Sequence, residues 1–305
     1  MHYWLHPELL HLYPDTNILG NPIYTFLLAP FAAAPHILLI IGYIVTFLLA
    51  LYFNQFLHKQ RLLTIQNYYP ALVVLTVSAL LPEWIIPSMP MLSSFLAMLL
   101  LQRLIVLYRK EKMYGQVFDI GLIVGLGILS YTSLVWFAVL LLFALFILRA
   151  FVLREWINVY TGIVVPLFLT GTWYFYTDRW PGFYTALLHN CSFHSTVQFS
   201  LNKGALAAYG TIVVLCLYLW IMMQSKPLSR LVLVRKVFWL WFHLSWVIAV
   251  SYFFTPNRSA THFYLFILPF SFYLSYYLCV EKNKWLRTVS FMLLVAVIAF
   301  QFLTL

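Results

Sequence analysis

The chain has 305 residues, of which 64% are hydrophobic and only 9% are charged. A soluble domain is about half apolar and about a quarter charged, so this composition excludes a cytosolic enzyme, a secreted module and a disordered chain. The formal net charge of +10 does not indicate a nucleic-acid partner, because in a membrane protein the position of each Lys and Arg matters more than their sum. We therefore predict an all-α, polytopic integral membrane protein.

Residues 1–22 are not expected to form a cleavable signal peptide, since they lack a basic start and their apolar residues are interrupted by His2, His6, Glu8, His11 and Asp15. Apolar residues recur at helical spacing near the start, which is typical of an amphipathic segment at a membrane surface. We predict an amphipathic or re-entrant segment on the outer face over residues 1–36. A single transmembrane helical domain then follows over residues 37–305.

Crossing the hydrocarbon core takes about 20 apolar residues. The chain offers about ten such stretches, at residues 37–57, 68–86, 88–108, 117–132, 133–153, 158–176, 205–224, 237–254, 263–280 and 286–305. The longest polar stretch, residues 178–204, is predicted to be a loop on the outer side.

Successive connections between the spans differ in their content of basic residues, and this difference predicts how the spans are oriented in the membrane. One face collects 15 of the 18 basic residues: Lys59, Arg61, Arg103, Arg109, Lys110, Lys112, Arg149, Arg154, Lys226, Arg230, Arg235, Lys236, Lys282, Lys284 and Arg287. The other face holds Arg179, Lys203 and Arg258. Since cytoplasmic loops are enriched in Lys and Arg, we expect the basic face in the cytoplasm and both termini on the non-cytoplasmic side. The membrane is predicted to be a bacterial inner membrane.

Two acids on the predicted outer face are candidates for chemistry, because ionisable residues are costly in a membrane. Glu83 lies among three prolines (residues 82, 87 and 90) that interrupt regular helix, and an interfacial Glu beside Trp84 is an equally good interpretation. Asp15 stands in Tyr-Pro-Asp-Thr-Asn (residues 13–17) between the amphipathic segment and the first span. A turn or helix cap is the alternative reading of Asp15.

Basic and histidine side chains on the same face are candidates for binding a phosphate. Arg258 and His262 belong to a dense polar insert between two aromatic-rich spans, and an Arg can hold a phosphate through two parallel hydrogen bonds. Arg179, His189 and His194 lie in the predicted outer loop. The spacing of His189, Cys191 and His194 fits no standard zinc pair and offers no fourth ligand, so no metal and no cofactor are predicted.

Glycines at residues 121, 125 and 127 form a stripe of small residues on the fourth predicted span. Such stripes let two helices approach closely in a membrane. We expect this stripe to pack against another helix.

Four stretches resemble the GT-C glycosyltransferases, multi-pass enzymes that use polyprenyl-phosphate sugars. They are Glu83 with its prolines, before a helix that reaches Arg103 and Tyr108-Arg109-Lys110; the glycine-rich residues 119–132; Pro166 with Thr172-Trp173-Tyr174; and Arg258 with His262-Phe263-Tyr264 and Leu268-Pro269. The resemblance covers about two-thirds of the chain. It implies a GT-C-like helical bundle. The chain also looks like uncharacterised bacterial multi-pass proteins of similar length.

The resemblance implies sugar transfer at the outer leaflet from a polyprenyl-phosphate donor. For a chain without the superfamily's first helix, it makes Asp15 the general base and Glu83 a second acidic site. Arg258 and His262 would face the lipid phosphate. The partners would be a lipid-linked sugar or other lipid phosphate, together with membrane lipids.

Two other functions stay open. Each outer loop offers a single acid instead of the paired acids of that superfamily, which favours a non-catalytic membrane component that scaffolds an envelope or secretion complex with membrane-protein partners. A lipid or solute transporter would need polar residues near the middle of the membrane and paired halves with broken helices. The sequence shows few such residues, so the transporter ranks third.

Overall fold

The computed structural model describes residues 23, 26–27, 31, 34–63, 67–81, 84–108, 113–148, 152–191, 203–225, 232–255, 260–281 and 283–304, and it contains helices and no strand within them. The first half has the α-helices α3 (Pro35–Lys59), α4 (Tyr69–Ser78), α5 (Met89–Val106), α6 (Tyr114–Ser130) and α7 (Phe137–Leu148), with the 3-10 helix η5 (Thr132–Trp136) before α7. The second half has α8 (Leu153–Tyr176), α9 (Trp180–Cys191), α10 (Lys203–Ser225), α11 (Val232–Ser251), α12 (Ile267–Val280) and α13 (Lys284–Thr304). The 3-10 helices η6 (Tyr252–Phe254) and η7 (Ala260–Phe266) join α11 to α12. The all-α prediction is confirmed for these residues.

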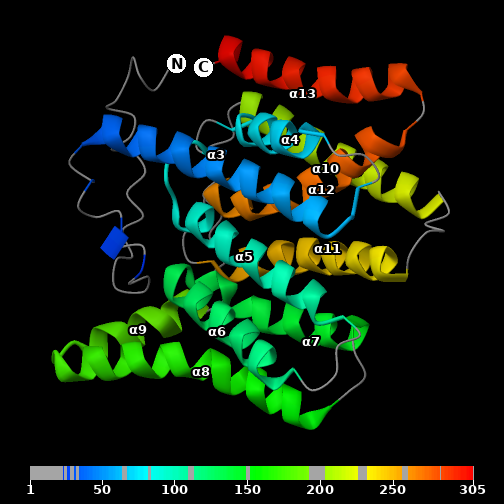
Figure 1. Cartoon of the computed structure of the whole chain (residues 1–305). Coiled ribbons are helices and arrows are strands. Elements are labelled where there is room, and N and C mark those ends of the chain that lie inside the picture. Colours follow the sequence, from blue (N-terminus) through cyan, green and yellow to red (C-terminus); the bar gives the residue numbers. More distant parts are fainter. Residues whose placement is uncertain are drawn as a thin grey trace.

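The long helices lie roughly parallel or antiparallel in one bundle and alternate in direction along the chain (Figure 1). At one end, called here the basic end, α3, α5, α7, α10 and α12 finish and α4, α6, α8, α11 and α13 begin. The described basic residues of these termini are Lys59, Arg61, Arg103, Arg154, Arg235, Lys236, Lys284 and Arg287. At the other end, called the opposite end, α6 finishes before η5 and α11 finishes before η6 and η7.

Prolines start three of the helices. The first turns of α3, α4 and α5 contain Pro35, Pro70 and Pro90, respectively. A residue without an N–H costs no helical hydrogen bond at this position. The predicted span over residues 68–86 contains only the ten-residue α4, which is about 15 Å long against a core of about 30 Å. Residues 79–81 and 84–88, which the structure describes between α4 and α5, are not α-helical, as expected for a segment that carries Pro82 and Pro87.

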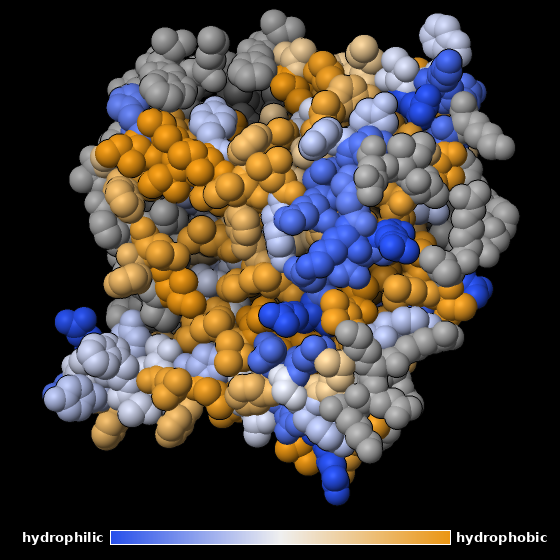
Figure 2. Space-filling view, viewed as in Figure 1, coloured by the Kyte–Doolittle hydropathy of each residue, from blue (hydrophilic) through white to orange (hydrophobic). Residues whose placement is uncertain are grey.

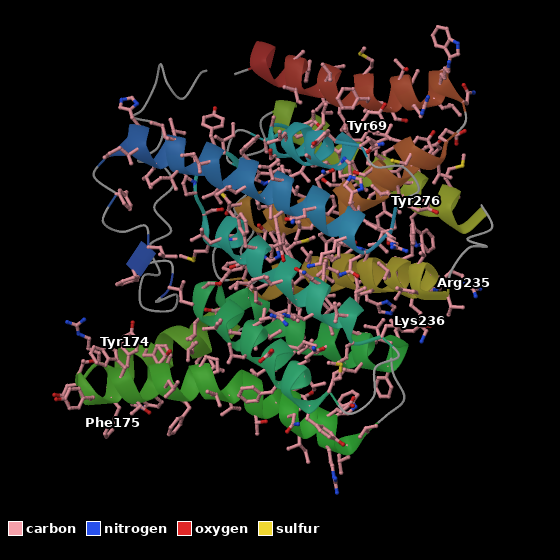
Figure 3. All side chains as sticks on the ribbon, in the orientation of Figure 1. Tyr69, Tyr174, Phe175, Arg235, Lys236 and Tyr276 are labelled. Atoms are coloured by element: carbon pink, nitrogen blue, oxygen red, sulfur yellow. The ribbon has the colours of Figure 1, made fainter. Side chains whose placement is uncertain are left out.

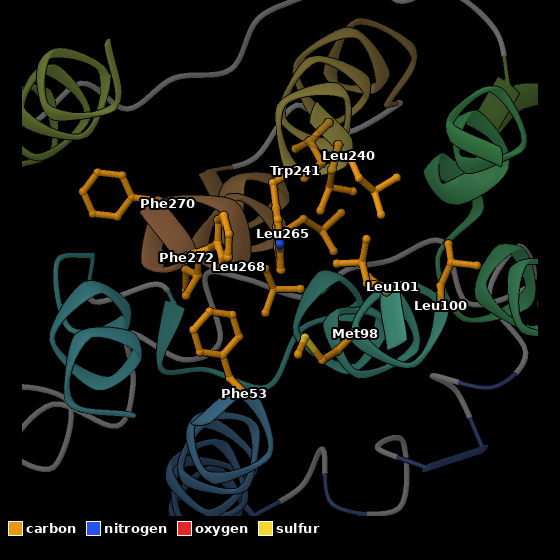
Figure 4. Packing of buried hydrophobic residues seen from close by; sticks show 14 of the residues in the cluster. Phe53, Met98, Leu100, Leu101, Leu240, Trp241, Leu265, Leu268, Phe270 and Phe272 are labelled. Carbon is orange, nitrogen blue, oxygen red and sulfur yellow. The ribbon is translucent and has the colours of Figure 1, made fainter. Parts of the chain in front are cut away.

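One continuous hydrophobic core joins the first half of the chain to the second. Figure 4 shows Phe53 of α3 and Met98 of α5 close to Trp241 of α11 and Phe272 of α12. The Trp241 and Phe272 rings stack with centroids 4.9 Å apart, and Phe53 meets Trp241 edge-on at 6.2 Å. Every α-helix from α3 to α13 except α9 contributes residues to this core, so these helices pack as a unit.

Four described helical segments are long and apolar enough to cross a membrane: His36–Lys59, Met89–Val106, Val232–Phe254 and Thr261–Val280. Shorter apolar helices are present as well, among them Tyr114–Ser130 and Thr132–Leu148. Hydrophobic side chains cover much of the visible surface over α3, and hydrophilic ones gather toward the end at which α3 finishes (Figure 2). These features support an integral membrane protein.

Glycines bring α6 and α8 into close contact. A Cβ atom added to Gly121 would lie 2.0 Å from the carbonyl oxygen of Val159, and one added to Gly162 would lie 2.4 Å from that of Phe118. Gly125 faces Ile163 and Pro166 of α8 in the same way. The structure thus gives two of the three predicted glycines a helix partner, whereas Gly127 faces Leu134 of η5.

Candidate functional site

The residues predicted for catalysis and phosphate binding divide into three groups. Asp15, Glu83, His194 and Arg258 lie outside the described residues, and so does the side chain of His189, whose backbone belongs to α9. Arg179 is exposed, and it lies in the turn between α8 and α9. His262 belongs to η7 and is fully buried. The described part of the site can therefore be built outward from His262.

The Nδ1 atom of His262 faces two hydroxyl groups. The Tyr131 hydroxyl oxygen lies 2.6 Å from it, and Oγ1 of Thr255 lies 3.3 Å away. Tyr131 is the residue that ends α6, in extended conformation, and Thr255 follows η6. Two helix ends far apart in the sequence are thus joined through one imidazole ring.

The Nε2 atom of His262 faces two acceptors. It lies 3.1 Å from the carbonyl oxygen of Ile248 and 3.2 Å from Oγ of Ser251. The Ser251 hydroxyl donates its own hydrogen to the Ile248 carbonyl at 2.9 Å, so both neighbours accept and Nε2 carries the proton. In the neutral ring Nδ1 is then an acceptor, and the Tyr131 hydroxyl donates to it.

Further hydroxyl groups extend this arrangement. Thr255 Oγ1 donates to the carbonyl oxygen of Ser251 at 3.0 Å and lies 3.0 Å from Oγ of Ser133 in η5. Since the Thr255 hydrogen is used by that carbonyl, Ser133 donates to Thr255. We call Tyr131, Ser133, Ser251, Thr255 and His262 the polar cluster. All five side chains are buried.

The polar cluster adjoins the segment that carries Glu83. Two residues after His262, the Tyr264 ring meets the Trp84 ring edge-on with centroids 6.2 Å apart, and the Tyr264 hydroxyl lies 3.2 Å from Oγ1 of Thr46 in α3. The backbone after Trp84 is pressed against the same helix, since a Cβ on Gly42 would lie 1.9 Å from the carbonyl oxygen of Ile85. Glu83 is bonded to Trp84, so its immediate neighbour in the chain is fixed beside η7.

The α8–α9 turn also approaches this end of the bundle. Asp178 adopts a positive φ of 55° at the turn, and α9 folds back so that Phe183 stacks on Tyr174 with ring centroids 4.6 Å apart. The helix α9 packs against η5, the element that carries Ser133. Figure 3 shows Tyr174 and Phe175 at this end of the molecule, far from Arg235 and Lys236 at the basic end.

The polar cluster consists of neutral groups, and it contains no carboxylate. It can hold chain ends in register and can order a neighbouring loop through hydrogen bonds. His262 is fully buried and both of its ring nitrogens are used by groups of the protein, so in this arrangement the ring has no nitrogen left to accept a proton from a substrate alcohol. Within the described parts of the chain, no group of three or more His, Cys, Asp and Glu side chains has an arrangement that could hold a metal ion.

Sequence reasoning found His262 and missed its partners. Tyr131, Ser133, Ser251 and Thr255 are hydroxyl residues next to or within apolar helices, where such residues are common and carry no spacing signature. The signal that could have found them is their position, because each stands at the end of a predicted span on the same side of the bundle.

Searches against protein-family models, curated proteins and solved structures gave no match to this chain.

Proposed function

We propose that this protein transfers a sugar from a polyprenyl-phosphate donor at the outer leaflet of a bacterial inner membrane. In this proposal it is a GT-C-like protein with about ten spans, its basic end in the cytoplasm and its termini on the other side. The site lies at the opposite end of the bundle, around the polar cluster.

One observation carries the proposal: the neighbours of Glu83 and of Arg258 in the chain meet in space. Arg258 belongs to the connection between Thr255 and His262, whose side chains lie 3.3 Å apart. Glu83 precedes Trp84, whose ring packs on Tyr264. In addition, Oγ of Ser88 in the Glu83 segment is buried without a hydrogen-bond partner among the described residues, and such an atom is available to a ligand or a water molecule.

The proposed chemistry is a single displacement at the anomeric carbon of the sugar. The bond from this carbon to the phosphate oxygen breaks, and the polyprenyl phosphate leaves with the electron pair. A bond to the acceptor oxygen forms, and the acceptor proton passes to the carboxylate of Asp15. No nucleotide, cofactor or metal is required, because a phosphate on a lipid is already a good leaving group.

Each predicted residue has a role in this step. Arg258 binds the phosphate and stabilises its growing negative charge, and His262 holds the Arg258 segment in place while Glu83 orients a substrate. Arg179, His189 and His194 contribute to phosphate binding from the α8–α9 side. The donor's lipid chain stays among the membrane lipids.

A second function, a non-catalytic membrane component, is favoured by one specific feature. Both ring nitrogens of His262 are already used by groups of the protein itself, and His262 is fully buried. A network saturated in this way can serve purely to hold the bundle together. Such a component would act by binding other membrane proteins of an envelope or secretion complex.

The test is a substitution set in cells that lack their own copy of the gene and carry a plasmid version. Asp15→Asn, Glu83→Gln and Arg258→Ala are compared with Asp119→Asn and Arg154→Ala, which remove the same kinds of charge elsewhere. General-base catalysis contributes about 100-fold or more to a rate, so the first set should lose the product glycan or glycolipid and the controls should keep it. Unchanged glycan and glycolipid profiles in all three site variants, at normal protein levels, would rule out the enzyme. Co-purification of another membrane protein with this chain in mild detergent, in a stoichiometric ratio, would then support the second function.

A further inference from the structure

A cavity of about 360 Å³ opens at the basic end, between the start of α4, the end of α12 and the first half of α13. It lies at the other end of the bundle from the polar cluster, and neither proposed function uses it. Tyr69, at the first position of α4, forms part of its wall, and Figure 3 shows this residue between α4 and α13 in that view.

The polar part of the cavity wall is cationic. Lys284 and Arg287 line it from α13, together with the hydroxyl-bearing Thr288. Arg287 and Thr288 follow Lys284 by three and four positions, so both lie on the same face of the helix as Lys284. Both basic side chains line the same space, so two like charges face it.

The rest of the wall is apolar. Leu72 and Val73 line it from α4, Leu278 from α12 and Phe291 from α13. Leu72 lines the cavity and is also exposed on the surface of α4. The charged side chains therefore lie beside an apolar wall that is open at α4.

We propose that this cavity binds the phosphate headgroup of an anionic lipid in the leaflet at the basic end. Arg287 pairs its planar fork with two phosphate oxygens, and Lys284 supplies a point charge beside it. Thr288 and Tyr69 offer hydroxyl donors. The lipid's acyl chains lie against the apolar wall that Leu72, Leu278 and Phe291 form.

The shape of the wall favours a lipid over free phosphate. Inorganic phosphate would gain nothing from Leu72, Leu278 or Phe291, and it would have to give up water beside them. A lipid interacts favourably with both parts of the wall. Basic residues near the membrane surface attract its anionic headgroup, and its acyl chains pack against the apolar side chains.

The experiment measures lipid binding to the purified full chain by native mass spectrometry in mild detergent. Phosphatidylglycerol is titrated against phosphatidylcholine and inorganic phosphate. The variant Lys284→Gln/Arg287→Gln is compared with Arg154→Gln/Arg235→Gln, which removes two charges from the same end without touching the cavity. The variant Thr288→Trp fills the cavity and keeps the charge.

One phosphatidylglycerol should bind the natural chain in preference to phosphatidylcholine. The cavity double variant should bind it roughly 30-fold more weakly, from about fivefold for each basic side chain. Thr288→Trp should also weaken binding, while the control double variant should change it by less than about threefold. Thr288 is exposed, so Thr288→Trp gives a second test if the cavity double variant does not fold. Equal loss in both double variants, equal binding of phosphatidylcholine, or equally tight binding of inorganic phosphate would each overturn the proposal.

Discussion

The hydroxyl of Tyr131 lies 2.6 Å from Nδ1 of His262, although 131 positions separate the two residues in the sequence. This bond ties the end of α6 to η7, and the same ring holds the last turn of α11 through Ile248 and Ser251. Three parts of the bundle are therefore fixed relative to one another by one buried side chain. The segment that carries Arg258 starts and ends at this point.

Tyr131→Phe removes the hydroxyl that donates to His262. We expect the free energy of unfolding to fall by about 1 kcal/mol, the usual net contribution of one hydrogen bond. His262→Ala should cost more, roughly 2–4 kcal/mol, because it leaves a cavity and deprives several polar groups of their partner. Unfolding of the full chain in a single detergent measures both effects. Tyr160→Phe, at an exposed position on α8, is the control, and an equal effect in that variant would contradict the structural role of His262.

Gly121→Ala tests the close approach of α6 and α8. The new Cβ atom would meet the backbone carbonyl of Val159 at 2.0 Å, so the helices must separate, and we expect a loss of stability of roughly 1–3 kcal/mol. Gly210→Ala in α10 places its Cβ in open space and should raise stability by up to about 1 kcal/mol. Thermal unfolding in detergent compares the two. Equal tolerance of both substitutions would show that α6 and α8 are farther apart than described.

Much of the helical architecture could be predicted because apolar runs and prolines are local signals. Each of the ten predicted stretches overlaps a helix, and Pro35 and Pro90 stand in the first turns of α3 and α5 as their residue type favours. The stretch at residues 68–86 was less predictable. Its apolar composition continues past Ser78, but α4 ends there, because composition does not encode where a proline-rich segment turns.

The contents of the loops were harder to predict than the spans. The predicted outer loop over residues 178–204 contains the helix α9. Phe183 of α9 is buried, but one buried residue does not make the repeating apolar pattern that predicts a helix. A polar neighbourhood could be predicted for His262, but the surroundings of its ring depend on Tyr131, Ile248 and Ser251, which come from other helices. Contacts of this kind depend on tertiary packing and leave no trace in spacing.

The proposed orientation, with the basic end in the cytoplasm, predicts which end reacts with a reagent that cannot cross the membrane. Arg61 and Arg179 are both exposed and lie at different ends of the bundle. In a chain whose three cysteines are replaced by serine, Arg179→Cys should react with a charged maleimide on intact spheroplasts. Arg61→Cys should react only after permeabilisation, since basic loops stay in the cytoplasm. The reverse pattern would place the basic end outside.

The proposed function requires that Glu83 and Arg258 meet beside His262 at an end of the bundle that faces away from the cytoplasm. Cross-linking measures this directly in the cysteine-free full chain that carries Glu83→Cys and Arg258→Cys. A protease site inserted within residues 192–202 separates the two cysteines, so the fragments stay joined after cleavage only where a link has formed. Glu83→Cys with Arg235→Cys is the control pair, because Arg235 lies at the basic end.

We predict that a short bismaleimide added to spheroplasts joins the Glu83→Cys/Arg258→Cys fragments and leaves the control pair separate. Separate fragments in the first pair, with each cysteine reacting singly from outside, would contradict the account.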